Sequence, residues 1–468
     1  MNQQVLEIPS ADLAVFAQEP RLERVPRQAS SSHERKFPFH DYLFVVLFVF
    51  GIASLVYANV HNAFFRPLWM AAEDHRWGHL FVRPSLLWLA MGTLLLAFRT
   101  VLWLRYRPFA AASMAEAPSL SVVIPAYNEG AMVMQAVESV ASAFYPANRL
   151  EIFVVDDGST DDTWKYIRRA AARFPKIVFP IRLPHNQGKR AALASGFRRA
   201  KGEVIVTLDS DSVIEPDALL AITGPFRDSR IGAVAGKVAV YNRREGLIPR
   251  MLHVQYVLSF DLMRAVESSY RTVYCCPGAL TAYRGPVLRG VLDEWMQQTF
   301  MGEPCTYGED RALTNSVLAA GFDTVYQRTA VVHTVVPEKY LKLCGMFLRW
   351  DRSYVREEIC FLKVVGKRPL GIRVVALCER LMTNLRYPIN YISLILLLTL
   401  SFSRPVLIPR LLLAIGMVSL FNTIYYLRSE LSKDFIYGVV YSYYAFFALF
   451  WIFPYAVLTV RARGWLTR

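Results

Sequence analysis

The chain has 468 residues, of which 54% are hydrophobic and 19% are charged. That mixture is too apolar for a typical soluble enzyme and too charged for a bundle of membrane helices alone, so it favours a soluble domain joined to transmembrane helices. The formal net charge is +15. In a membrane protein such an excess usually reflects Lys and Arg retained on the cytoplasmic side, and it also suits an anionic ligand. No nucleic-acid-binding motif accompanies the charge, and we expect no nucleic-acid partner.

The N-terminal part of the sequence predicts a polar tail followed by two transmembrane helices. Residues 1–39 are polar and rich in Arg, and we predict a disordered cytoplasmic tail there. Apolar stretches at 42–60 and 86–104 approach the roughly 20 residues that a spanning helix needs, which assigns 40–107 to two transmembrane helices. Arg residues precede the first stretch and follow the second. The positive-inside rule therefore predicts a cytoplasmic central region and an external loop at 63–82.

The central part of the sequence alternates short apolar runs with helical patterns. The runs that predict strands cover residues 120–125 (LSVVIP), 150–155 (LEIFVV) and 203–208 (EVIVTL). This alternation is typical of a mostly parallel sheet with helices on both faces. Ligands of such sheets bind beyond the carboxyl ends of the strands, and acidic clusters follow the second and third runs there. We therefore predict an α/β domain over 110–336 with its site at that edge.

The C-terminal part returns to a membrane-like composition. Residues 337–387 interleave charged and apolar side chains, which predicts amphipathic helices in the membrane interface. An ordinary half-buried helix of the central domain is an equally good interpretation for the first half of this segment. Further apolar runs predict transmembrane helices within 388–468. Three such spans would leave the terminal Arg residues outside, against the charge rule, so the sequence leaves five and six spans open.

The strongest candidate metal site is Asp209-Ser210-Asp211, directly after the third predicted strand. Two carboxylates that flank one residue can hold a hard divalent cation such as Mg²⁺ or Mn²⁺, whose remaining positions are filled by phosphate oxygens. Such a cation would offset the charge of a departing nucleoside diphosphate. A solvated turn is the alternative interpretation, since many Asp-x-Asp sequences are no more than that.

Two other segments supply groups for a nucleotide. Asp156 and Asp157 end the second predicted strand, where their carboxylates can accept hydrogen bonds from a base or ribose; a helix cap is the alternative. Residues 186–190 (NQGKR) place Lys189 and a second cation beside a glycine, where the backbone can approach phosphate closely. A surface turn is the alternative for that segment.

Two later segments supply groups for a transfer reaction. Asp310 lies at the start of a predicted helix, where it could deprotonate an acceptor hydroxyl as a general base. The alternative is an acidic residue that stabilises the first turn of that helix. Arg349 offers a cation for a diphosphate and Trp350 an aromatic face for a sugar ring. An interfacial helix carrying Arg and Trp is the alternative.

Six of these motifs occur in a fixed order along the chain. They are PAYNE (125–129), DDGS (156–159), NQGK (186–189), DSD (209–211), GED (308–310) and RW (349–350). The ordered set resembles glycosyltransferase family 2, in its membrane-integrated polysaccharide synthase branch. The segment 308–322 and the RWDRSYVRE sequence at 349–357 are most similar to hyaluronan synthases and the nodulation chitin-oligosaccharide synthase. The resemblance covers about residues 118–360.

The resemblance implies a fold, an activity and a cellular location. It implies a GT-A-like nucleotide-sugar-binding domain inserted between transmembrane α-helices, in a multi-pass protein of the inner (plasma) membrane with a cytoplasmic catalytic domain. The implied partners are a UDP-sugar donor, a polysaccharide or lipid-linked acceptor and the lipid bilayer. The implied reaction transfers a sugar, N-acetylglucosamine or a related one, with inversion to a β-linkage. The product would leave through the membrane helices.

The resemblance also assigns roles to individual residues. Tyr127 would stack on the base, with Glu129 of the same motif in the substrate site. Asp156 and Asp157 would hold the uridine, and Lys189 would face the donor.

On the reaction side, Asp209 and Asp211 would bind the metal and diphosphate. The resemblance makes Asp310 the base, puts Arg349 on the diphosphate and brings Trp350 near the acceptor. The segment 276–280 (CPGAL) resembles a loop that lines the acceptor site.

The sequence departs from this branch at one place. Two Gln residues usually lie three and two positions before the Arg of the Arg-Trp pair, and here those positions hold Met346 and Phe347. Their loss favours a single-transfer enzyme acting on a lipid acceptor, whereas the several C-terminal spans favour a polymer synthase. An inactive nucleotide-sugar-binding membrane protein is a third interpretation, against which the intact acidic motifs argue.

Overall fold

The computed structural model describes residues 79–462, except 404 and 406, and a few isolated positions between 46 and 70. By internal contacts the chain divides into a unit of residues 1–42 and a unit of residues 43–468, and only the second contains described residues. The predicted tail at 1–39 lies outside the described residues, as does most of the first predicted span at 42–60.

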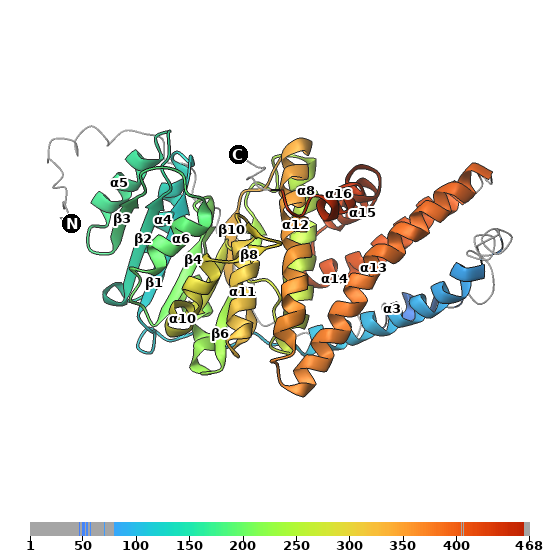
Figure 1. The fold of residues 1–468 in the computed structure, drawn as a ribbon, viewed down its shortest axis with the longest axis horizontal. Coiled ribbons are helices and arrows are strands. Elements are labelled where there is room, and N and C mark those ends of the chain that lie inside the picture. The colour runs from blue at the N-terminus through green and yellow to red at the C-terminus, as the bar shows by residue number, and fades with distance from the viewer. Residues whose placement is uncertain are drawn as a thin grey trace. The chain divides into compact units, whose positions relative to one another are not determined.

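An eight-stranded sheet forms the centre of the second unit, in the order β3-β2-β1-β4-β7-β6-β10-β5 (Figure 1). Its strands are β1 (Leu120–Ala126), β2 (Leu150–Asp156), β3 (Val178–Arg182), β4 (Val204–Leu208), β5 (Ser212–Ile214), β6 (Ile231–Val240), β7 (Leu280–Arg284) and β10 (Asp323–Thr334). The three strands predicted from the sequence are β1, β2 and β4. Every residue of β1 and β4 is buried, as expected for strands that are covered on both faces.

The sheet is mixed but mostly parallel, as predicted: β6 and β10 are parallel to one another and run in the same direction as β1 to β4, and only β7 and β5 are reversed. Strands β3, β2, β1 and β4 are parallel neighbours, but β7 runs antiparallel to both β4 and β6, and β5 runs antiparallel to β10. The antiparallel direction has a consequence for the site. Leu208 at the end of β4 pairs with Leu280 at the start of β7, so the loop before β7 lies at the edge where Asp209 follows β4.

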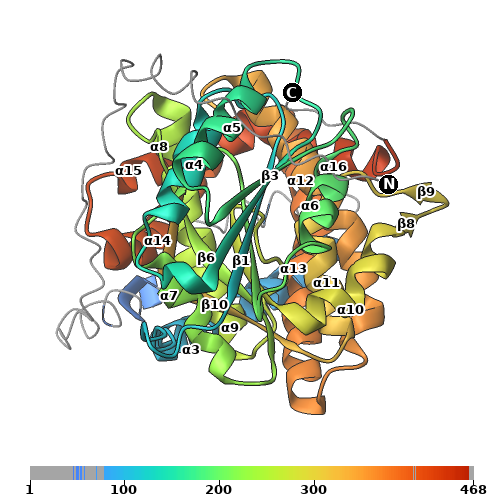
Figure 2. The same cartoon turned by 90° about the vertical axis from the view of Figure 1, so that its left-hand side faces the viewer.

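Helices cover both faces of the sheet (Figure 2). On one face lie α4 (Met132–Ala141), α5 (Thr163–Arg173) and α7 (Ala218–Thr223), and on the other α6 (Lys189–Phe197), α10 (Gly285–Met296) and α11 (Glu309–Ala319). Helix α6 packs closely on β1, because a Cβ on Gly196 would lie 2.3 Å from a methyl carbon of Val123. The tight packing fixes where the N-terminus of α6 meets the edge of the sheet. A short hairpin, β8 (Thr299–Phe300) and β9 (Glu303–Pro304), precedes α11.

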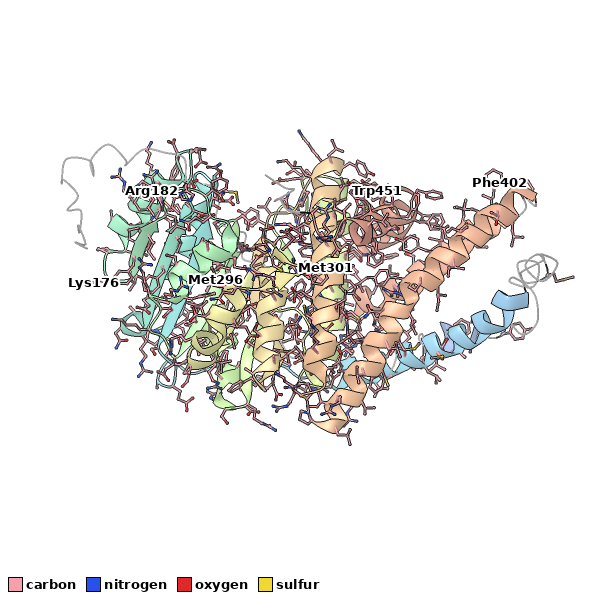
Figure 3. The ribbon with its side chains drawn as sticks, in the orientation of Figure 1. Lys176, Arg182, Met296, Met301, Phe402 and Trp451 are labelled. Atoms are coloured by element: carbon pink, nitrogen blue, oxygen red, sulfur yellow. The ribbon has the colours of Figure 1, made fainter. Side chains whose placement is uncertain are left out.

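The remaining helices lie beside the β6–β10 half of the sheet. They are α3 (His79–Arg105), α8 (Leu247–Val257) with the π-helical segment η4 (Leu258–Arg264), α9 (Ala265–Ser269), α12 (Tyr340–Val365), α13 (Leu370–Ser403), α14 (Leu407–Glu430), α15 (Phe435–Tyr444), η5 (Ala445–Leu449) and α16 (Ile452–Leu458). Helices α3 and α13 extend away from the sheet (Figure 1). Phe402 lies at the far end of α13, where its side chain is exposed (Figure 3).

Helix α12 packs against the sheet domain through buried polar side chains. Asn315 of α11 donates to the carboxylate of Glu357 at 3.0 Å, and Arg352 donates to the hydroxyl of Thr459 at 2.9 Å. Arg356 and Glu358 are also buried. The charged residues of α12 therefore hold it between α11 and the C-terminal helices.

Within the described part of the chain, one helix is long and apolar enough to cross a membrane by itself, at Leu411–Glu430. A second segment meets the same criterion only as a pair, Phe435–Leu449 and Ile452–Leu458, which are bent by 46° to one another. Both coincide with apolar runs of the sequence. The total of five or six spans stays a prediction.

Candidate active site

A cleft of about 930 Å³ opens at the carboxyl ends of β1, β2 and β4. Its other walls come from the loop before β7, the start of α11, and helices α8 and α12. Eight of the residues predicted to form the site line this cleft: Tyr127, Asp157, Lys189, Asp209, Asp211, Asp310, Arg349 and Trp350. Asp156 and Glu129 do not line it. The structure thus brings together segments that lie more than 200 residues apart in the sequence.

Asp157 holds the loop that leads into α6. Its two carboxylate oxygens accept hydrogen bonds from the backbone N–H groups of Gln187 and Gly188, each at 2.8 Å. Burial raises the pKa of Asp157, and these two bonds lower it only in part. The neighbouring Gly158 has φ +71°, and a Cβ there would lie 2.5 Å from the carbonyl carbon of His185. The DDGS turn and the NQGK loop therefore form one unit at the edge of the cleft.

Asp156 is fully buried behind this unit. Its Oδ1 accepts a hydrogen bond from the backbone N–H of Ser159 at 3.0 Å, and its Oδ2 lies 3.2 Å from Nε of Arg182 on β3. Arg182 lies on the edge strand of the sheet (Figure 3). Asp156 thus orients the turn and does not face the cleft. Glu129 lies outside the cleft as well, and its backbone N–H donates to the hydroxyl of Thr163 at 2.8 Å.

Lys189, the first residue of α6, pairs with two carboxylates in the cleft. Its Nζ lies 2.6 Å from Oδ1 of Asp209 and 3.1 Å from Oε1 of Glu309. Burial alone would lower the pKa of Lys189, but the two carboxylates more than offset it and the net pKa is raised. A Cβ on Gly278 would lie 2.9 Å from that same Nζ. A glycine in the loop before β7 thus leaves room for the cation.

Asp209 and Asp211 fit a divalent cation by their chemistry. Asp211 is half-buried, and the loss of solvation together with the adjacent charge of Asp209 raises its pKa to about 6. A bound cation would relieve this repulsion. Asp211 accepts hydrogen bonds from the hydroxyls of Ser212 at 3.2 Å and Thr334 at 3.3 Å. Among the described residues, no group of three or more His, Cys, Asp or Glu could hold a metal, so ligand oxygens would have to complete the coordination.

Asp310 lies in the first turn of α11, with its carboxylate in the cleft. Burial and the charge of neighbouring Glu309 raise its pKa, while the charges of Lys189 and Arg311 lower it in part. Its Oδ1 accepts from the backbone N–H of Arg311 at 2.7 Å, and the thiol of Cys275 donates weakly to Oδ2 at 3.6 Å. A carboxylate with a raised pKa is suited to accept a proton near neutral pH.

Arg349 and Trp350 reach the cleft from α12, which packs directly on the start of α11. Gly308 has φ +72°, and a Cβ on it would lie 2.0 Å from the hydroxyl oxygen of Ser353. This close approach places the Asp310 end of α11 beside Arg349. The ring of Trp350 is partly exposed in the cleft, with its centroid 5.6 Å from that of Phe347.

Comparison with known proteins decides the family. The model of glycosyl transferase family 2 matches residues 121–291. An N-acetylglucosaminyltransferase of Azorhizobium caulinodans is 31% identical over 355 residues, which cover 75% of this chain and 87% of that protein. The chain belongs to glycosyltransferase family 2. A hyaluronan synthase of Streptococcus pyogenes is 32% identical over 337 residues, covering 71% of this chain and 75% of that protein. The predicted resemblance is thus confirmed, and this family 2 member is a glycosyltransferase.

A solved structure supports the fold of this family 2 chain. A mannosyltransferase of Pyrobaculum calidifontis, solved in complex with GDP-Man and Mn²⁺, aligns with a TM-score of 0.56 at 19% identity, covering 76% of this chain and 98% of that one. At this identity the likeness concerns the fold alone. The central domain has a GT-A-like glycosyltransferase fold with a mixed sheet.

Two residues of this family 2 cleft, Glu309 and Tyr256, were not predicted as site residues. Glu309, the second carboxylate on Lys189, lies in the GED motif, but no role of its own was predicted for it. Gly278 lies in the 276–280 loop that the resemblance implied, and its position beside Lys189 depends on the antiparallel direction of β7. Tyr256 of α8 also lines the cleft, and no motif in the sequence pointed to it.

Proposed function

We propose that the protein is an inverting membrane glycosyltransferase. It transfers N-acetylglucosamine or a related sugar from a UDP-sugar to a growing β-linked polysaccharide, which leaves through the membrane helices. The observation that carries this proposal is the cleft that joins Lys189, Asp209 and Asp211 to Asp310 and Arg349. Two relatives with similar chains are named N-acetylglucosaminyltransferase and hyaluronan synthase, which supports an N-acetylglucosamine donor first.

The donor diphosphate lies at the polar end of the cleft. Lys189 and Arg349 supply cations for its oxygens, and Tyr127 and Asp157 face the nucleoside. A Mg²⁺ or Mn²⁺ ion held by Asp209 and Asp211 would act as a Lewis acid that offsets the negative charge of the leaving diphosphate. Glu309 keeps Lys189 in place in the absence of donor.

The transfer step needs one proton acceptor on the acceptor side. The carboxylate of Asp310 takes the proton of an acceptor hydroxyl, and the oxygen attacks the anomeric carbon of the donor sugar. The bond from that carbon to the diphosphate oxygen breaks, and UDP leaves with the electron pair. Because attack and departure occur on opposite faces, the configuration inverts.

The membrane placement rests on the apolar helices. The helix Leu411–Glu430 and the bent pair from Phe435 to Leu458 are apolar enough to cross a bilayer. Large apolar side chains are exposed along α13 up to Phe402, where a lipid environment would cover them. With the Arg-rich segments inside, the cleft faces the cytoplasm, where UDP-sugars are available.

A second candidate function is a single transfer to an acceptor, without polymer growth. It is favoured by Met346 and Phe347, which line the cleft next to Arg349 without any amide group. Product length separates the two candidates, because a polymer synthase gives a ladder of masses and a single-transfer enzyme gives one increment.

The proposal is tested by incubating the purified full-length protein with UDP-N-acetylglucosamine, UDP-glucose, UDP-glucuronate and GDP-mannose. UDP release and product mass are measured with Mn²⁺, with Mg²⁺ and with a chelator.

We expect UDP release from a UDP-sugar in the presence of metal, and loss of this release in chelator and in the Asp211→Asn variant. Asp293→Asn, which changes an exposed carboxylate on α10, is the matched control. Full turnover in chelator would contradict the metal role, and no turnover of any donor would support an inactive binding protein.

A further inference from the structure

One wall of the cleft is apolar where a saccharide acceptor would need hydrogen bonds. We define the apolar wall as Leu252 and Tyr256 of α8, Met346 and Phe347 of α12, and Tyr441 of α15, all of which line the cleft. The five side chains belong to one packed cluster. Figure 2 shows α8 and α12 apart from one another, with α15 near α8 and α16 near α12.

The apolar wall begins at the reacting end of the cleft. The ring of Trp350 lies 6.3 Å from the ring of Tyr256 and 5.6 Å from the ring of Phe347. Burial raises the pKa of Tyr256, and the negative charge of nearby Asp211 raises it further. An acceptor sugar on Trp350, with a hydroxyl at Asp310, therefore has the apolar wall directly beside it.

The apolar wall continues into helices that are suited to a lipid environment. Met346 and Leu252 pack in the same cluster as Leu449, Ile452 and Ala456. Those three residues belong to the bent pair that is apolar enough to cross a membrane. Helix α15 contacts α8, and α16 contacts α12. The apolar wall is therefore packed directly against the helices that are apolar enough to enter the bilayer, and an acyl or alkyl chain on the wall would have Tyr441 of α15 as its boundary on that side.

The chemistry of the apolar wall disfavours a second sugar at this place. Sugar hydroxyls that lose water without gaining a hydrogen bond are costly to bury, and Met346 and Phe347 offer no side-chain donor or acceptor. An alkyl chain gains free energy when it is buried there. The residues at 346 and 347 thus select the group to which the acceptor sugar is attached.

We propose that the apolar wall is an acceptor subsite for the lipid portion of a glycolipid, so that the accepting sugar is one linked to a long alkyl or acyl chain. The proposal rests on the glycosyl transfer proposed above, favours its second candidate, the single transfer, and names the acceptor class of the same cleft. Phe347 and Met346 are its specificity-determining residues, Trp350 carries the sugar, and the chain runs toward α15 and α16.

The test compares acceptors that share a sugar and differ in the alkyl chain. Full-length protein in lipid nanodiscs receives the UDP-sugar that it turns over, with methyl, butyl or octyl β-N-acetylglucosaminide. The readout is the ratio of kcat/KM for octyl over methyl, in which a general loss of activity cancels. Because each buried methylene contributes appreciably, we expect a ratio of at least about tenfold, rising with chain length. Hexadecyl N-acetylglucosaminide in vesicles should also be glycosylated, which separates a membrane lipid from a soluble alkyl glycoside.

Three variants assign the preference to the apolar wall. Phe347→Gln should lower the octyl-to-methyl ratio at least about threefold, since a polar group replaces apolar contact area. Phe347→Leu keeps the apolar contact and should preserve the ratio. Phe179→Gln, on β3 outside the cleft, is the matched control and should leave the ratio unchanged.

Each contrary result has a distinct meaning. Equal kcat/KM for methyl and octyl acceptors would overturn the lipid subsite and leave the glycosyltransferase function standing. A ratio that is unchanged in Phe347→Gln and in Met346→Gln would show that the preference arises from partition into the bilayer and would overturn the assignment. Failure to glycosylate the hexadecyl acceptor would exclude a membrane lipid. Absence of UDP release from every donor would defeat the proposed function itself.

Discussion

Two adjacent carboxyls on α11 have opposite electrostatic environments. Glu309 is buried but lies 3.1 Å from Nζ of Lys189, whose charge lowers its pKa against the effect of burial. Asp310 is half-buried without a comparable ion pair, and its pKa is raised. Neighbouring titratable groups whose pKa values are pushed apart are typical of sites with divided roles. Glu309 is therefore suited to stay ionised and to hold Lys189, and Asp310 is suited to accept a proton.

This difference predicts how activity depends on pH. A general base must be deprotonated, so the rate is lost as pH falls through the raised pKa of Asp310, at a higher pH than for an ordinary Asp near 3.9. The profile of kcat/KM against pH measures it. Replacing Glu309 by Gln removes a charge that raises the pKa, so the acid limb should move to lower pH whatever the absolute rate. An acid limb that ends at an ordinary Asp value in the unmodified protein would contradict the assignment.

The sequence proposed a role for each candidate site residue, but strand patterns predicted the position of only some of them, and the grouping of the others into one site depended on the resemblance. Asp157, Asp209 and Asp211 follow strand ends, and parallel neighbours bring such ends to one edge. Asp310 and Arg349 lie on helices outside the sheet, and no strand pattern places them beside that edge. The interior position of Asp156 could not be predicted either, since adjacent residues after a strand face in different directions and the sequence does not show which one faces inward.

At the scale of elements, the turn after β2 and the loop before α6 act together. Asp157 accepts two backbone hydrogen bonds from that loop, and Gly158 lies against His185. The strands β1, β2 and β4 were predictable because long apolar runs end in turn residues. The direction of β7 was not, because its five residues carry no signal that distinguishes parallel from antiparallel pairing. That direction is nevertheless what brings Gly278 to Lys189.

Gly158→Ala tests this joint unit. The new Cβ would lie 2.5 Å from the carbonyl carbon of His185 at φ +71°, so the loop must move. We expect a destabilisation of about 1–3 kcal/mol and weaker UDP binding, measured by thermal unfolding and calorimetric titration. Gly290→Ala on α10 is the control, because no atom lies within 4 Å of its added Cβ and Ala is favoured in a helix by about 0.5–1 kcal/mol. Unchanged UDP affinity in a folded Gly158→Ala protein would separate the loop from the donor site.

At the scale of the whole molecule, buried charges tie the sheet to the C-terminal helices. Lys237 of β6 lies 2.7 Å from a carboxylate oxygen of Asp261 in η4 and 3.3 Å from one of Glu430 at the end of α14. Arg99 of α3 pairs with Glu379 of α13. Such paired charges satisfy one another where water is excluded. They join the catalytic domain to the helices that we propose to be embedded in the bilayer.

The predicted orientation can be measured by cysteine labelling of intact cells. Cys378 is the exposed native thiol among the described cysteines, so Cys378→Ser provides the background. A Cys introduced at Met70 should react with a membrane-impermeant maleimide, because the loop 63–82 is predicted to be external. A Cys introduced at Arg230, an exposed residue of the catalytic domain, should react only after permeabilisation. The reverse pattern would mean that the topology is inverted.

The most direct test of the central claim measures UDP affinity and sugar transfer on one preparation of Asp310→Asn, beside Asp293→Asn and the unmodified protein. The amide keeps the shape of Asp310 but cannot accept a proton, so we expect transfer to fall by about 10²–10⁴-fold. UDP affinity should be retained, because the residues proposed to bind uridine and diphosphate lie on other elements. If Asp310 only stabilised the first turn of α11 by its charge, it would contribute about 0.3–1 kcal/mol to the stability of the protein. Normal transfer by Asp310→Asn would contradict the account, and lost UDP binding would mean that Asp310 supports the donor site instead.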